Sequence, residues 1–105
     1  MSGNSQEAKA DAGKIRPSLV PVELITGVAE IRDYGTKKYE EGGDDNWKRV
    51  EAQRFWDATL RHALAAWHDW KKKDPESGKL HIKHMATNLA FLLAFYEEGN
   101  DNDGK

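Results

Sequence analysis

Apolar residues recur at helical spacing in three separate stretches of this chain. The first stretch begins after Pro21, which suits a first helical turn, and is expected to run to about Glu40. Its apolar positions, three or four residues apart, are Leu24, Val28 and Ile31. Because that spacing places them on one face of a helix, the pattern predicts an amphipathic helix.

Two longer apolar patterns follow the first. The second helix is expected to run from about Glu51 to Lys72, and the third from about Leu80 to Glu97. Their stripes consist of large side chains: Trp56, Leu60, Leu64, Trp67 and Trp70 in the second, and Ile82, Met85, Leu89, Leu92 and Leu93 in the third. No stretch alternates apolar and polar residues as a half-buried strand does. The sequence therefore predicts an all-α fold, a small bundle of three main helices.

The two ends of the chain are polar, and the part between them forms one domain. Residues 1–13 are rich in small and polar side chains, and residues 97–105 form an acidic tail without apolar side chains, so we expect both segments to be flexible. Residues 14–96 are then a single helical domain. Three helices give only a thin hydrophobic core, so either the segment from Ile15 to Val20 packs across them or a partner completes the bundle. We favour the second and expect a homo-oligomer, a dimer or a tetramer.

Composition narrows the functional classes. The 105 residues include 16 Lys and Arg against 18 Asp and Glu, a formal charge of −2, so we expect no nucleic-acid partner. The absence of cysteine excludes disulfides, thiolate zinc sites and cysteine nucleophiles. No apolar run of about 18 residues indicates a membrane span, and no signal peptide is recognisable. We therefore expect a cytoplasmic protein that does not associate with membranes.

Side chains that bind metal ions are concentrated between the second and third helices. A turn that contains Asp74 and Glu76 precedes His81 and His84, which share one face of the third helix. We expect these four residues to hold a divalent metal. Mg²⁺ or Mn²⁺ would prefer the carboxylates, whereas zinc would prefer the imidazoles. In the alternative interpretation, Asp74 caps a turn and the histidines are satisfied at a helix interface.

Cationic side chains elsewhere favour an anion as the ligand. Arg61 and His62 are adjacent on the second helix, and Lys14 and Lys38 precede them in the chain. Such groups bind phosphate oxygens. If the second and third helices pair antiparallel, Arg61, His62 and Asn88 lie along their interface, farther down than the acids. Alternatively, Arg61 forms an ordinary surface pair with an acid on its own helix.

The end of the first helix and the loop that follows it offer a third set of residues. Tyr39, Asn46 and Trp47 combine aromatic rings with an amide, and these groups can stack on a nucleobase and hydrogen bond to its edge. The simpler interpretation is that the aromatic side chains cover the end of the bundle.

Several motifs occur in an order that is specific to one family. Along the chain they are Asp11-Ala12-Gly13-Lys14, Tyr34-Gly35-x-x-Lys38-Tyr39, Asn46-Trp47, Arg61-His62 and Asp74-x-Glu76-Ser77-Gly78-x-x-His81-x-x-His84. Over about residues 11–95 the chain resembles the phage-type dATP/dGTP diphosphohydrolase N-terminal domain family, a MazG-like branch of the all-α nucleotide pyrophosphohydrolases. The resemblance implies hydrolysis of a purine deoxynucleoside triphosphate, dGTP or dATP, to monophosphate and pyrophosphate. It also implies Mg²⁺ or Mn²⁺ as cofactor and the host cytoplasm as the place of action.

The chain departs from MazG-type enzymes in its acidic residues. It does not carry their Glu-Glu-x-x-Glu and Glu-x-x-Asp motifs on a plausible pair of helices, so we expect a different ligand set. As a hypothesis, Glu76, His62, Arg61 and Lys38 are catalytic, Lys14, Tyr39, Asn46, Trp47 and Asn88 bind substrate, and Asp74, Glu76, His81 and His84 bind metal. Two other functions stay open: a phage protein that binds nucleotides without turnover, and a helical interaction module.

Overall fold

The computed structural model describes residues 12–38 and 43–98. Its elements are the short 3₁₀ turn η1 (Pro17–Leu19), α2 (Val22–Lys38), the 3₁₀ segment η2 (Gly43–Arg49), α3 (Ala52–Ala65) and α4 (His81–Glu97). One isolated bridge, between Lys73 and Leu80, is the only β-type pairing in these residues. The predicted all-α bundle of three main helices is confirmed. Most of the two segments predicted to be flexible, 1–13 and 97–105, falls outside the described residues.

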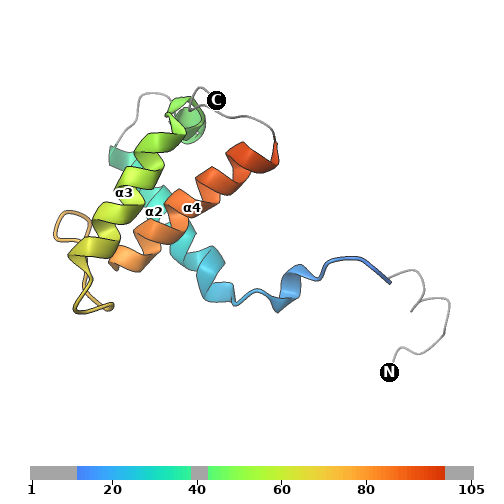
Figure 1. The fold of residues 1–105 in the computed structure, drawn as a ribbon, viewed down its shortest axis with the longest axis horizontal. Helices are drawn as coiled ribbons and strands as arrows, with labels where there is room; N and C mark the ends of the chain where they lie inside the picture. Colours follow the sequence, from blue (N-terminus) through green and yellow to red (C-terminus); the bar gives the residue numbers. More distant parts are fainter. Residues whose placement is uncertain (1–11, 39–42, 99–105) are drawn as a thin grey trace.

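The central helix of the bundle is α4. It packs antiparallel beside α3 and also contacts α2, which crosses behind the pair (Figure 1). The described residues before α2 extend away from the three helices, and Ile15 in this segment is 88% exposed. The α3–α4 pair is therefore the structural centre, and α2 covers one side of it.

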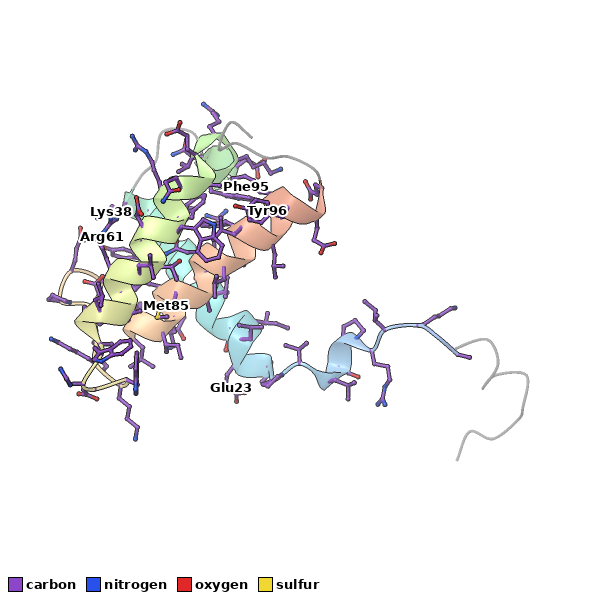
Figure 2. All side chains as sticks on the ribbon, viewed as in Figure 1. Glu23, Lys38, Arg61, Met85, Phe95 and Tyr96 are labelled. Carbon is purple, nitrogen blue, oxygen red and sulfur yellow. The ribbon has the colours of Figure 1, made fainter. Side chains whose placement is uncertain are left out.

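Aromatic packing holds α3 and α4 together at one end. Phe55 of α3 packs against Leu92 and Phe95 of α4, and all three side chains are buried. Trp47 of η2 covers this cluster by stacking on Phe91, with ring centroids 4.6 Å apart and planes inclined by 15°. Figure 2 shows the labelled Phe95 near the C-terminal end of α4. Burial of these rings supplies most of the apolar core at this end of the bundle.

A glycine brings α2 close to α4. A Cβ atom on Gly27 would lie 3.4 Å from Cγ of Lys83, so the lysine stem crosses directly over the glycine. The Nζ atom of the same lysine donates a 2.9 Å hydrogen bond to Oε1 of Glu30, farther along α2. Glycine weakens a helix interior by about 1 kcal/mol relative to alanine, and here it makes room for a side chain that links two helices.

The second helix is shorter than predicted. It ends at Ala65 rather than near Lys72, and residues 66–72 form turns. Trp67 and Trp70, which were expected to extend its apolar stripe, are both more than half exposed and contact each other edge to face. The apolar pattern continues past the point at which the chain must reverse to bring α4 back alongside α3.

The end of the first helix is only partly visible. Its last described residue is Lys38, and the predicted end near Glu40 falls outside the described residues.

Among the helices that the structure describes, none is both long and apolar enough to cross a bilayer.

Replacing Leu92, which is 2% exposed, by alanine should lower the free energy of unfolding by about 2–5 kcal/mol, because it leaves a cavity between α3 and α4. The matched change Leu24→Ala, at a leucine that is 49% exposed, should cost less than about 1 kcal/mol. Chemical denaturation followed by circular dichroism measures both values. Equal losses for the two variants would contradict the position of the core.

Candidate functional site

The loop between α3 and α4 is folded tightly around Asp74. Its Oδ1 atom accepts a 2.7 Å hydrogen bond from the backbone N–H of Glu76, and its backbone carbonyl accepts one of 2.8 Å from Gly78. Gly78 has a φ of +73°, a left-handed conformation that glycine adopts without steric cost. The bridge between Lys73 and Leu80 closes the loop. These bonds determine where the second carboxylate oxygen of Asp74 points.

That oxygen faces two histidines from different helices. Oδ2 of Asp74 lies 4.0 Å from Nδ1 of His62 on α3 and 3.7 Å from Nε2 of His84 on α4. The two imidazole rings stack with centroids 4.5 Å apart and planes inclined by 7°. One ligand atom from each residue lies within 4.8 Å of the others, and no other such group occurs in the described part of the chain. We refer to these three residues as the triad.

Burial and charge set the protonation states of the triad. Burial, together with the neighbouring histidines His84 and His81, lowers the pKa of His62 from 6.5 to about 4. Burial also lowers the pKa of His84, against the opposing effect of Asp74. Burial raises the pKa of Asp74, but the N–H of Glu76 and the nearby histidines outweigh it, and the net shift is downward. At neutral pH the triad therefore offers two neutral imidazoles and one carboxylate, the forms that bind metal ions.

Two of the four predicted metal ligands lie outside the triad. Glu76 forms an ion pair with Lys38 instead. His81 is 4% exposed, with its Nδ1 atom 2.8 Å from Nδ1 of His62 and its Nε2 atom buried without a hydrogen-bond partner.

The structure places His62 opposite Asp74, and not farther down the helix interface as we expected. The reason is that α3 ends soon after His62, so this histidine lies at the loop end of the interface.

Two cationic side chains share a cavity with the triad. This cavity of about 520 Å³, the triad cavity, is lined by the triad together with Lys38 of α2, Arg61 of α3 and Glu76 of the loop. Figure 2 shows the labelled Lys38 and Arg61 close together at the edge of the bundle. Two cations beside a site that can hold a metal ion form an environment suited to a polyanion.

A second cavity lies beside the first. It has a volume of about 440 Å³, and Ile31 and Gly35 of α2 line both cavities. Three predicted substrate-binding residues, Asn46, Trp47 and Asn88, line this second cavity. Because its wall also includes the aromatic core at the η2 end of the bundle, we call it the aromatic cavity.

Two predicted substrate-binding residues are not placed at these cavities. Lys14 is exposed in the segment before α2 and lines neither cavity, and Tyr39 lies outside the described residues. Two residues were not expected next to His84: Ser77, whose Oγ lies 2.7 Å from Nε2 of His84, and Tyr34, whose ring meets the imidazole edge-on. Both stand inside the recognised motifs, which was the only signal in the sequence.

Stability should decrease as the pH falls below 6.5. Between pH 6.5 and about 4 the unfolded chain takes up a proton on His62 that the folded protein does not bind, so acid favours unfolding. The melting temperature should therefore be highest above pH 6.5 and fall towards pH 4. His62→Gln should weaken this dependence, whereas His68→Gln, at an exposed position, should leave it intact. A melting temperature that is constant over this range would contradict the buried neutral imidazole.

Comparison with known proteins gives this geometry a context. The sequence profile of the family described as "dATP/dGTP diphosphohydrolase, N-terminal" matches residues 4–105. A protein of Salmonella phage PMBT28, named dATP/dGTP diphosphohydrolase, is 33% identical over 85 residues, which are 81% of this chain and 28% of that protein. The chain thus spans less than a third of the length of this relative. No solved structure matches the chain significantly. Since the profile covers nearly the whole sequence, the chain belongs to the dATP/dGTP diphosphohydrolase N-terminal domain family.

Proposed function

We propose that this domain binds a purine deoxynucleoside triphosphate, dGTP or dATP, and supports its metal-dependent hydrolysis to monophosphate and pyrophosphate in the host cytoplasm. The observation that carries the proposal is that the triad and two cations, Lys38 and Arg61, line one cavity. A triphosphate is polyanionic, and enzymes that cleave it combine cationic side chains with divalent metal ions. The name and the phage origin of the relative support the same substrate and setting.

The donor set of the triad favours Mn²⁺ over Mg²⁺. Two of its three donors are imidazole nitrogens, and Mg²⁺ prefers oxygen ligands at near-ideal octahedral positions. We therefore assign His62, Asp74 and His84 as the protein ligands of Mn²⁺. When bound, such an ion neutralises phosphate charge and lowers the pKa of coordinated water.

The cationic side chains bind the phosphates. The planar guanidinium of Arg61 can donate two parallel hydrogen bonds to a phosphate group. Lys38 is paired with Glu76, and a phosphate oxygen that takes the place of this carboxylate would leave Glu76 available to accept the proton of an attacking water molecule. The proposed function thus gives Glu76 a role as general base rather than as a metal ligand.

The aromatic cavity holds the base. Its wall combines the indole of Trp47 with the amides of Asn46 and Asn88. Side-chain amides offer one acceptor and two donors, which match the edge of a purine, and aromatic rings contact its face. The alternative without turnover would use the same two cavities.

The substitution Asp74→Asn tests the proposed metal site while keeping the loop folded. The amide oxygen of asparagine can still accept the N–H of Glu76, so the melting temperature should change by only a few degrees, but the group opposite the histidines loses its charge. Pyrophosphate release from dGTP with Mn²⁺ should fall by about 100-fold or more. The control His68→Gln should keep wild-type activity.

Two outcomes of this assay count against hydrolysis at the triad. If Asp74→Asn releases pyrophosphate at the wild-type rate, the metal assignment is wrong. If dGTP stabilises the wild-type protein equally with Mn²⁺ and with EDTA, and no product forms in the presence of Mn²⁺, the domain binds nucleotides without turnover.

We propose in addition that the domain forms a homodimer through the outer face of α3 and α4. Trp56, Leu60 and Leu64 are exposed on α3, and Leu89 and Leu93 are exposed on α4. The indole N–H of Trp56 donates to the hydroxyl of Tyr96, so the two rows lie side by side. An antiparallel helical pair with one apolar face is half of a four-helix bundle, and a second copy completes it with two-fold symmetry.

Leu60→Asp should convert the dimer to a monomer, because it places a charge in the centre of the apolar contact. Light scattering coupled to size-exclusion chromatography measures the mass of each variant. The control Lys71→Asp alters the charge of an exposed turn residue and should leave the dimer intact. A monomeric wild-type protein at about 100 μM would overturn the proposal, since specific interfaces of this kind bind more tightly than that.

A further inference from the structure

The triad cavity and the aromatic cavity meet along one stripe of α2. Ile31 and Gly35 are one helical turn apart, and both residues line both cavities. Thr36, on one side of this stripe, lines only the aromatic cavity. Lys38, on the other side, lines only the triad cavity. The helix therefore runs between the cavities, and its Ile31–Gly35 stripe forms their common boundary.

The cavities also follow one another along α4. His84 lines the triad cavity, whereas Asn88 and Phe91 line the aromatic cavity. Seven residues of helix separate His84 from Phe91, a rise of about 10 Å. This separation is comparable to the distance between the base and the phosphates of an extended nucleotide.

Neither packing nor backbone conformation explains the glycine at position 35. It lies inside α2 with an ordinary helical backbone, and a Cβ atom there would meet no other heavy atom within 4 Å. Gly27 differs, because the stem of Lys83 lies against it. Glycine in a helix interior is less favourable than almost any other residue. What the absence of a side chain at Gly35 provides is open space at the boundary of the two cavities.

We propose that Gly35 keeps this boundary open so that one nucleotide occupies both cavities, with its base in the aromatic cavity and its phosphates in the triad cavity. The inference rests on the proposed function and adds to it how the ligand is selected. A ligand that fills only one cavity, such as an inorganic polyphosphate, does not cross the boundary. The glycine therefore matters for the binding of an intact nucleotide, whose sugar passes over α2 at Gly35, and not for the binding of a polyphosphate.

The test replaces Gly35 by leucine, which is a strong helix former and long enough to fill the boundary. Calorimetric titration uses Mn²⁺, inorganic tripolyphosphate and a dGTP analogue with a methylene bridge between the α- and β-phosphates. In Gly35→Leu the Kd of the analogue should rise at least about tenfold, while the Kd values of Mn²⁺ and tripolyphosphate stay within about twofold of wild type. The melting temperature should not decrease, which excludes loss of folding as the cause.

Two control variants isolate the effect. Gly35→Ala adds only a methyl group and should change the affinity for the analogue much less than leucine does, while Ala29→Leu adds the same side chain to an exposed position of α2 that lines neither cavity. Unchanged affinity of Gly35→Leu for the analogue would overturn the inference, and so would an equal loss of tripolyphosphate affinity. If wild-type protein binds neither tripolyphosphate nor the analogue, the proposed function itself is wrong and the inference falls with it.

Discussion

The antiparallel pairing of α3 with α4 determines where each functional group of this domain lies. Packing of Phe55 against Phe95 sets the pairing at one end, and the closed loop around Asp74 sets it at the other. With both ends defined, His62 is held opposite His84, although the two are separated by 22 positions in the chain. The triad therefore depends on the register of the two helices, and α2 adds one cation, Lys38, and a boundary to a site that the helical pair has already assembled.

Helical periodicity predicts the main elements of this fold because amphipathic stripes are a local property of the sequence. The point where α3 ends is not local in that sense. Trp67 and Trp70 continue the apolar pattern, yet the chain turns there because the aromatic packing and the Asp74 loop require α4 to return alongside α3. Overestimating the length of this helix also misplaced His62, since the residue belongs to the loop end of the interface only when the helix stops at Ala65.

The residues of the candidate site could be grouped from the sequence only where they are neighbours in the chain. Asp74 and His84 lie ten positions apart and were recognised together, whereas the third member of the triad comes from another helix. The partner of Glu76 is Lys38, 38 positions away, and no spacing rule links two such residues. Asn46 and Asn88 were predicted to bind substrate for separate reasons, Asn46 from its loop beside aromatic residues and Asn88 from its place along the helix interface. Only the structure shows that both line one cavity.

Asp74 gives its two carboxylate oxygens separate tasks. Oδ1 maintains the loop through the N–H of Glu76, while Oδ2 faces His62 and His84. The turn contact and the position opposite two histidines thus coexist in one side chain. The consequence is that few side chains could replace it. Asparagine and serine retain an acceptor for the turn but not the charge, and glutamate retains the charge but extends the chain by one methylene group, so no other amino acid preserves both tasks.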